Sequence, residues 1–267
     1  MLYLRVLSAL LGIPIMLGAV FLGGPWYALL LLIVVNLGIF EYCTMLRSSG
    51  YRVPLIASFA GVTLFLAVIY FELYDFIYPL VMVLFTALFV ISLFNTERNS
   101  ITGAAISFWG IVYLGGLSGY LLSLRMMPEG ALYTYMLLAG VWLHDSVAYF
   151  IGTKWGLHKF SPSISPKKSV EGSVAGIMAA ALLFFSAVIL LPDIMPFSPG
   201  IGLLFGLGIA VFAQLGDLLE SALKRQLEVK DSGSLIPGHG GILDRFDSLL
   251  LTAPFVYYFF VILNMSL

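Results

Sequence analysis

The sequence predicts an all-α protein, a polytopic membrane helical bundle of about nine transmembrane helices with a cytoplasmic N-terminus. Two observations of composition favour this fold class: the 267 residues are 61% hydrophobic and 10% charged, and the mean hydropathy is +1.04. A third is that the apolar residues form long unbroken runs. Because lipid offers no partner to backbone N–H and C=O groups, such runs must be helical, whereas a membrane barrel needs alternating segments.

Nine apolar runs, separated by charged or Gly/Pro-rich breaks, are the expected spans. Each approaches the roughly 20 residues that a helix needs to cross a bilayer. We expect the first run to be a retained span, because no small-residue cleavage site of a signal peptide precedes the second run. In chain order the runs cover 6–24, 26–46, 54–71, 76–94, 103–124, 131–151, 174–192, 200–219 and 248–264.

The distribution of positive charge predicts the orientation of these spans. Twelve of the thirteen Lys and Arg residues fall at the N-terminus or in even-numbered gaps, and Arg125 falls on the opposite face. Positive residues are retained on the cytoplasmic side. The N-terminus and the even-numbered gaps are therefore expected in the cytoplasm.

Composition also limits the classes of partner. The formal net charge of -1 gives no reason to expect nucleic acid. The lone Cys43 excludes an intramolecular disulfide and a cysteine-ligated zinc site. Any charge-based site must therefore be local.

We expect two functional regions. Residues 1–130 form a scaffold of N-terminal transmembrane helices, and 131–267 form the catalytic region, with cytoplasmic loops at 152–173 and 220–247. Pairs of glycines spaced four apart favour close helix packing within the chain, and contacts in a homodimer are the alternative. These pairs are Gly115/Gly119, Gly152/Gly156 and Gly202/Gly206.

A charged stripe opens the second loop. Asp217, Ser221, Lys224 and Glu228 recur at helical spacing, with Glu220 beside them, on a helix that continues the eighth span. A solvated helix face whose charges pair with one another explains this stripe equally well.

A glycine-rich turn follows, at Pro237–Gly241 around His239. Glycine allows positive φ and a close approach of backbone N–H groups to an anion. Asp244, Arg245 and Asp247 come next, and the three-residue spacing puts the two carboxylates on one side of a helix start, where oxygen ligands suit Mg²⁺. Capping of the helix by Asp244 is the competing interpretation.

Further polar residues lie upstream. Asp145 lies inside an apolar run, where a carboxylate needs a cation or a hydrogen-bond network. Lys167 and Lys168 follow a proline in the first loop, where they bind either substrate phosphates or anionic lipid headgroups. Taken together, the aspartates and basic groups on one membrane face suggest metal-assisted phosphate chemistry. A P-loop, a zinc HExxH motif and a Ser-His-Asp arrangement are absent from the sequence.

These residues form a long pattern that resembles a known family. From Ser221 to Asp247 the sequence S-A-L-K-R-x4-K-D-x-G-x2-I-P-x-H-G-G-I-x-D-R-F-D is similar to the signature of the phosphatidate cytidylyltransferases, also called CDP-diacylglycerol synthases. The stretches G-D-L-x-E-S, D-x2-A-Y-x2-G and I-S-P-K-K-S-x-E-G resemble the family as well, so the similarity covers at least 145–247. Glu228 stands where relatives often have Gly, and Ser169 where many have Thr.

The resemblance implies an Mg²⁺-dependent nucleotidyltransferase of phospholipid biosynthesis. It would join CTP and phosphatidic acid into CDP-diacylglycerol and pyrophosphate at the inner membrane, with its active site facing the cytoplasm. A metal ion and basic groups allow the two anionic substrates to meet. The implied cofactor is Mg²⁺, with room for a second cation such as K⁺.

The roles implied by the resemblance fall into three groups. The metal ligands are Asp217 and Asp244, with Asp145 and Asp247 as nearby ligands or supporting groups. The catalytic groups are Asp217, Asp244, Lys167, Lys224, Arg225 and Arg245. The substrate-binding residues are Lys168, Ser221, Lys230, Asp231, Gly238, His239, Gly240 and Gly241.

Two other functions remain as alternatives. A CTP-dependent polyprenol kinase would use a similar donor and metal but would release CDP in place of pyrophosphate. An ion-coupled secondary transporter would bind its coupling ion at Asp145 and Asp217, although no internal repeat is evident.

Overall fold

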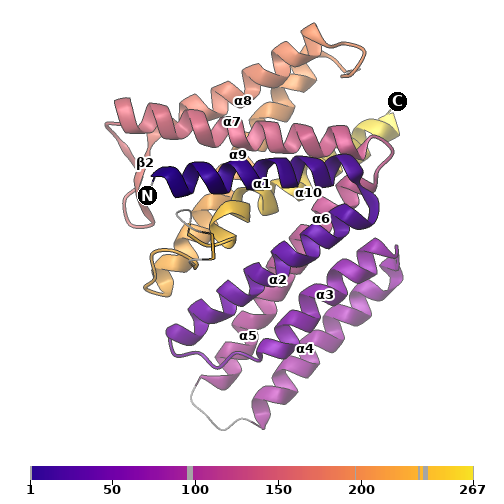
Figure 1. Ribbon diagram of the computed structural model, residues 1–267, viewed down its shortest axis with the longest axis vertical. Coiled ribbons are helices and arrows are strands. Elements are labelled where there is room, and N and C mark those ends of the chain that lie inside the picture. Colours follow the sequence, from indigo (N-terminus) through magenta and orange to yellow (C-terminus); the bar gives the residue numbers. More distant parts are fainter. Residues whose placement is uncertain (1, 95–98, 196, 234, 237–239, 267) are drawn as a thin grey trace. The chain divides into compact units, whose positions relative to one another are not determined.

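The computed structural model describes residues 2–94, 99–195, 197–233, 235–236 and 240–266, and most of them are helical (Figure 1). The α-helices are α1 (Leu2–Leu22), α2 (Gly24–Ser48), α3 (Leu55–Tyr70), α4 (Ile77–Leu93), α5 (Ser100–Ile111), α6 (Leu117–Met126), α7 (Gly130–Trp155), α8 (Val170–Leu190), α9 (Pro199–Gln226) and α10 (Leu243–Ser266). A 3₁₀ turn, η1 (Tyr74–Phe76), leads into α4, and a π-helical turn, η2 (Val112–Gly116), joins α5 to α6.

The prediction of a helical membrane protein is confirmed at the level of its class. Among the described residues, six helical stretches are long and apolar enough to cross a bilayer: Gly24–Ser48, Tyr74–Leu93, Ser100–Met126, Val170–Leu190, Pro199–Gln226 and Leu243–Leu263. Shorter apolar helices cover Leu10–Leu22 and Leu55–Tyr70. Nine crossings and the cytoplasmic N-terminus stay predictions.

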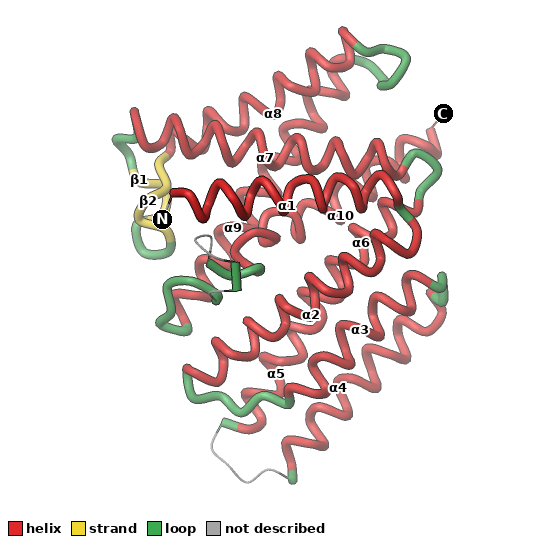
Figure 2. Tube along the Cα trace, viewed as in Figure 1, coloured by secondary structure: helices red, strands yellow, loops and turns green. Residues whose placement is uncertain are grey.

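A small β-hairpin departs from the all-helical expectation (Figure 2). Strands β1 (Lys159–Ser161) and β2 (Ser165–Ser169) pair antiparallel within the first loop, with Lys159 opposite Ser169. Strands of three and five residues are too short to show an alternating pattern in the sequence. Pro166 is tolerated in β2 because both strands of a two-stranded sheet are edges.

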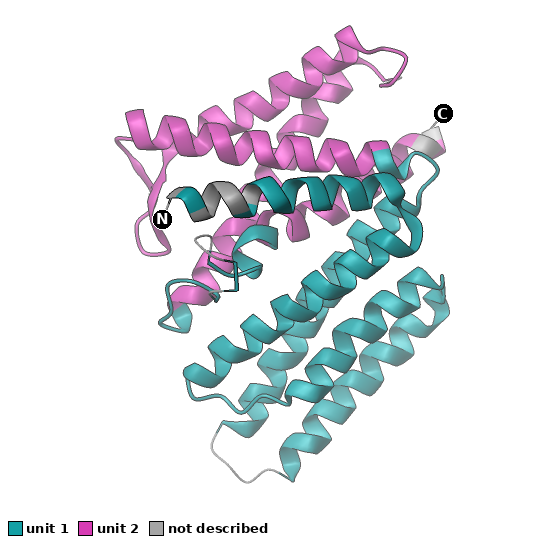
Figure 3. Ribbon diagram, viewed as in Figure 1, with its two compact units in different colours: residues 1–131, 226–246 teal, residues 132–225, 247–267 magenta. Residues whose placement is uncertain are grey.

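The chain forms two compact units (Figure 3). Unit 1 comprises 1–131 and 226–246, and unit 2 comprises 132–225 and 247–267. Most of the signature stretch, 226–246, therefore belongs to the same unit as the N-terminal helices. The functional division at residue 130 stays a prediction.

The core of unit 1 is built around α3, which packs against α2, α4, α5 and α6. Glycines permit the closest approaches: a Cβ at Gly115 would lie 3.2 Å from Phe65, and one at Gly119 would overlap Ile69. Tyr42 crosses from α2 to donate a hydrogen bond of 2.8 Å to the Ile106 carbonyl. The nearby thiol of Cys43 is fully buried.

In unit 2 the helices also meet at glycines. A Cβ at Gly172 of α8 would lie 2.9 Å from Gly152 of α7, and one at Gly202 of α9 would lie 2.8 Å from Val188 of α8. At Gly206 of α9 it would overlap the α8 backbone. The glycine pairs of the sequence thus serve packing within the chain, and the homodimer stays untested.

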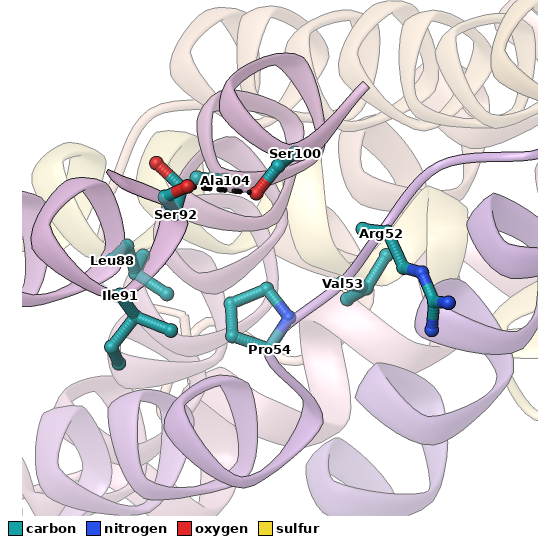
Figure 4. Close-up of a pocket in the computed structure, with 8 residues that line it drawn as sticks. All are labelled: Arg52, Val53, Pro54, Leu88, Ile91, Ser92, Ser100 and Ala104. Atoms are coloured by element: carbon teal, nitrogen blue, oxygen red, sulfur yellow. Dashed lines mark hydrogen bonds between the residues drawn. The ribbon is translucent and has the colours of Figure 1, made fainter. Parts of the chain in front are cut away.

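A small pocket of about 120 Å³ lies in unit 1 (Figure 4). Its lining is mostly apolar, and at one side the Ser100 hydroxyl donates to the Ser92 carbonyl at 3.1 Å. None of the predicted site residues lines it. The lining residues are Arg52, Val53, Pro54, Leu88, Ile91, Ser92, Ser100 and Ala104.

Candidate functional site

In unit 2, the hairpin and helix α9 bring a predicted cation and a predicted metal ligand together. Lys168 Nζ on β2 lies 2.5 Å from Asp217 Oδ2 on α9. The Ser221 hydroxyl, one helical turn further along α9, donates to Asp217 Oδ1 at 3.3 Å. Both carboxylate oxygens of Asp217 therefore have partners, and its side chain is 34% exposed.

In unit 2, Asp247 interacts electrostatically with three other acidic side chains. Asp247 on α10 is 7% exposed, and it lies within the electrostatic range of Asp217, Glu220 and Asp145. The Ser248 amide donates to Asp247 Oδ1 at 2.8 Å. Carboxylates concentrated in this way repel one another, so they favour cations, whether lysines or metal ions.

Two basic residues of α9 take different partners. Lys224 pairs with Glu220 one turn earlier, and Glu220 is 2% exposed. The exposed Arg225 donates from Nε to the Ile164 carbonyl in the hairpin turn at 3.1 Å. Part of the charged stripe is therefore paired within its own helix, as the structural interpretation expected, but Glu220 is buried, so this part is not the solvated face of that interpretation. Arg225 connects α9 to the hairpin.

In unit 1, Asp244 at the start of α10 accepts several hydrogen bonds from the loop that precedes the helix. Its Oδ2 accepts hydrogen bonds from the Gly241 amide at 2.8 Å, the Ser232 amide at 3.1 Å and the Ser232 hydroxyl at 2.9 Å. Asp244 lies in the first turn of α10, and these donors belong to the loop before it, so the bonds differ from those of an N-cap side chain, which accepts from amides inside the helix. The anion that the Gly241 amide binds here is a side chain of the protein itself.

A second carboxylate, from helix α2, contacts residues of the same loop. Glu41 of α2 is 2% exposed. Its Oε2 accepts from the Leu243 amide at 3.0 Å and lies 3.3 Å from the Ser232 hydroxyl. Further back in the loop, the Ser49 hydroxyl at the end of α2 donates to the Leu227 carbonyl at 2.8 Å. Helix α2 therefore supports the loop at two points.

The backbone of the loop requires unusual conformations. Gly240 has φ of 86°, which suits glycine. Glu228 has φ of 58°, in the left-handed region that glycine favours. The turn before Lys230 thus forms with Glu228 at the position where the family resemblance leads one to expect glycine.

The other predicted residues are spread over both units. Asp145 of α7, Lys167 of β2, and Lys230, Asp231 and Arg245 of the signature stretch have exposed side chains. Gly238 and His239 lie outside the described residues, so their predicted contacts with nucleotide stay predictions.

The acidic residues suit Mg²⁺ by their chemistry. Within the described ranges, no three His, Cys, Asp or Glu side chains are already arranged to hold a metal ion. Mg²⁺ is commonly bound by one or two carboxylates, with waters and substrate phosphates completing the octahedron. The half-buried Asp217, whose present partner is a cation, fits that role without a complete protein cage.

Sequence reasoning left Glu41 open between a functional and an interfacial residue, placed Glu220 beside the charged stripe without a site role, and gave no role to Ser232. Glu41 stands in the apolar run of α2, and a buried acid there is a signal for a functional or structural partner. Its partner Ser232 lies 191 residues away, so the sequence contains no spacing that joins them.

The chain matches the model of the Cytidylyltransferase family over residues 3–263. It is 34% identical over 261 residues to a phosphatidate cytidylyltransferase of Bacillus subtilis, covering 95% of this chain and 96% of that protein. A phosphatidate cytidylyltransferase of Synechocystis sp. is 35% identical over 293 residues, covering 97% and 96%. One of Staphylococcus saprophyticus is 40% identical over 162 residues, which is 60% of each chain.

Proposed function

We propose that this chain, which belongs to the cytidylyltransferase family, transfers the cytidylyl group of CTP to phosphatidic acid and releases pyrophosphate. The observation that carries the proposal is the Lys168–Asp217 pair inside a group of acidic side chains, on a helical membrane scaffold. Such a site deals with the central difficulty of the reaction, which is to bring a lipid phosphate and a triphosphate together.

The bond changes are simple. A phosphate oxygen of phosphatidic acid attacks the α-phosphorus of CTP, a P–O bond forms, and the bond between the α-phosphorus and the bridging oxygen breaks. Pyrophosphate leaves with the bonding electron pair. The attacking oxygen is already anionic near neutral pH, so no strong general base is required, and catalysis consists of positioning and charge stabilisation.

Acidic residues would hold the cofactor. Asp217 and Asp244 are the proposed Mg²⁺ ligands, with Asp145 and Asp247 as further ligands or supporting groups, and a second cation such as K⁺ is compatible with so many carboxylates. When bound, Mg²⁺ would neutralise the triphosphate and stabilise the departing pyrophosphate.

The cationic and loop residues would hold the substrates. Lys167, Lys224, Arg225 and Arg245 are proposed to contact the reacting phosphates. The proposed binding residues for CTP or the lipid headgroup are Lys168, Ser221, Lys230, Asp231, Gly238, His239, Gly240 and Gly241. Both loops are proposed to face the cytoplasm from the inner membrane, where CTP is available and the lipid remains in the bilayer.

A product assay tests this function. Purified protein in vesicles that contain phosphatidate and a polyprenol receives CTP labelled in the cytidine ring, and both the lipid product and the released product are identified. We expect labelled CDP-diacylglycerol and pyrophosphate, lost on chelation of divalent ions and restored by Mg²⁺. Release of CDP with a phosphorylated polyprenol would indicate the kinase instead, and ion-driven solute uptake without CTP would indicate a transporter.

A further inference from the structure

A buried acid in α2 has no role in the reaction described so far. Glu41 is 2% exposed on a helix that is otherwise suited to cross the membrane. Within the described part of the chain its Oε1 has no hydrogen-bond partner. Burial of a carboxylate with an unsatisfied oxygen is costly, so such a residue needs a compensating interaction or function.

Within the described ranges, the hydrogen bonds given for the Glu41 side chain are with the residues that lead into α10. Oε2 accepts a hydrogen bond from the Leu243 amide at 3.0 Å. This amide lies in the first turn of α10, where backbone N–H groups have no partner within the helix. The same oxygen lies 3.3 Å from the Ser232 hydroxyl. Glu41 therefore contacts both ends of the segment 232–243.

Two glycines of the signature stretch make room for this carboxylate. A Cβ at Gly233 would overlap Glu41 Oε1, and a Cβ at Gly241 would overlap both Glu41 Oε2 and the Ser232 hydroxyl. The close approach of the backbone at these positions thus serves a carboxylate of the protein, in addition to any role toward a substrate.

Ser232 joins Glu41 to Asp244. Its hydroxyl lies 2.9 Å from Asp244 Oδ2, and its amide donates to the same oxygen at 3.1 Å. A displacement of the loop relative to Glu41 would therefore move the groups that hold the Asp244 carboxylate.

We propose that Glu41 is a positioning residue, which holds Ser232 and Leu243 in place and, through Ser232, orients Asp244 for the reaction. The proposal rests on the cytidylyl transfer proposed above. It does not require Glu41 to touch a substrate or a metal ion. A residue that merely filled space would need volume but no hydrogen-bond acceptor, and this difference can be measured.

The first experiment measures the loop directly, without activity. Amide hydrogen exchange is followed in the full-length chain in lipid nanodiscs, for Glu41→Leu, which keeps most of the volume, and Glu41→Gln, which keeps one acceptor oxygen. Cys43→Ala is the matched control, because Cys43 is also fully buried in α2 and contacts Ser58 of α3.

We expect exchange across 240–244 to be at least about tenfold faster in Glu41→Leu, the scale of one lost buried hydrogen bond. Glu41→Gln should lie between Glu41→Leu and the wild type, and Cys43→Ala should match the wild type. Equal protection in Glu41→Leu and the wild type would overturn the proposal.

The second experiment measures turnover. Glu41→Leu is expected to lower kcat at least about tenfold and to change KM for phosphatidate by less than about twofold, because orientation is lost while lipid binding remains. Glu41→Gln should recover part of kcat. Ser232→Ala tests the same connection from the loop side and keeps the proposal testable if Glu41→Leu does not fold.

The double variant completes the test. If Glu41 acts through Ser232, the two substitutions together should lower kcat by less than the product of their separate effects. Fully multiplicative effects would contradict the connection. Lost protection with unchanged kcat would overturn the orienting role, although Glu41 would still hold the loop. Absence of transfer in the wild type as well would contradict the proposed function itself.

Discussion

At the scale of single residues, Asp244 has one observed structural role and one proposed catalytic role, and a single substitution can separate them. Its Oδ2 accepts three hydrogen bonds from Gly241 and Ser232, which stabilise the loop, and its negative charge is proposed to bind Mg²⁺. An asparagine keeps an acceptor oxygen but lacks the charge.

Asp244→Asn should therefore fold while cytidylyl transfer falls at least ~100-fold, the scale of one lost electrostatic contact in a transition state. Turnover is measured at saturating Mg²⁺ alongside the melting temperature. Asp193→Asn, at an exposed aspartate, is the control and should keep wild-type turnover. Near-normal turnover in folded Asp244→Asn would refute the role of this carboxylate as a ligand.

Backbone conformation makes a separate prediction at Glu228. A residue with a Cβ in the left-handed region costs about 1 kcal/mol or more, whereas glycine costs about 0.5–1 kcal/mol of unfolded-state entropy. Glu228→Gly should therefore leave the free energy of unfolding unchanged or raise it by up to about 1 kcal/mol. Thermal unfolding in detergent measures the change.

Lys230→Gly is the matched control, because Lys230 lies two residues away and is outside the positive-φ region. This variant should lower stability by about 0.5–1 kcal/mol. If both substitutions destabilised the protein equally, the strain assigned to Glu228 would be wrong.

At the scale of elements, the side chain of Arg125 in α6 caps the C-terminal end of α1. Its Nε donates to the Val20 carbonyl at 2.6 Å and its Nη2 to the Phe21 carbonyl at 3.4 Å. These are carbonyls of the last turn of α1, which have no partner within the helix. The positively charged side chain also interacts favourably with the helix dipole.

Arg125→Met should lower the free energy of unfolding by about 1.5–3 kcal/mol, because it removes charge-assisted hydrogen bonds from partly buried carbonyls. Arg125→Lys should be intermediate, because it keeps the charge but lacks the planar fork. Melting temperatures in detergent provide the comparison. A wild-type melting temperature in Arg125→Met would show that the capping contact contributes nothing.

The helices and the hairpin also show which secondary structure can be predicted from the sequence and which cannot. Long apolar runs identify the helices because lipid leaves the backbone no alternative, and this holds for the stretch from α5 through α6 as well as for α9. The β1–β2 hairpin was missed because its pairing depends on register over a few residues, and its prolines suggest a plain loop.

The site residues also include some that sequence patterns point to and some whose contacts depend on tertiary structure. The family resemblance implies that Asp217 and Asp244 bind metal, which stays a prediction, whereas the Lys168–Asp217 pair depends on the folded hairpin and has no signal in the sequence. The contact of Glu41 with Ser232 depends on tertiary packing over 191 residues. No local periodicity records such a contact.

At the scale of the whole molecule, the positive charges predict which membrane face holds the hairpin. In a Cys43→Ala background, a cysteine introduced at exposed Ser163 should react with an impermeant maleimide in inverted vesicles and stay unreacted in right-side-out vesicles. A cysteine at exposed Glu129, between the fifth and sixth predicted spans, is the control and should show the reverse. Labelling of both positions from one side would overturn the nine-span topology.

Ser232 has a single hydroxyl hydrogen, although two acidic oxygens lie within its reach. The contact with Asp244 Oδ2 is the shorter, at 2.9 Å against 3.3 Å to Glu41 Oε2, and the hydroxyl can donate to only one of the two at a time. A proton or a positive ion bound at Asp244 would weaken that acceptor and favour donation to Glu41. Two carboxylates far apart in the chain thereby compete for one hydrogen atom.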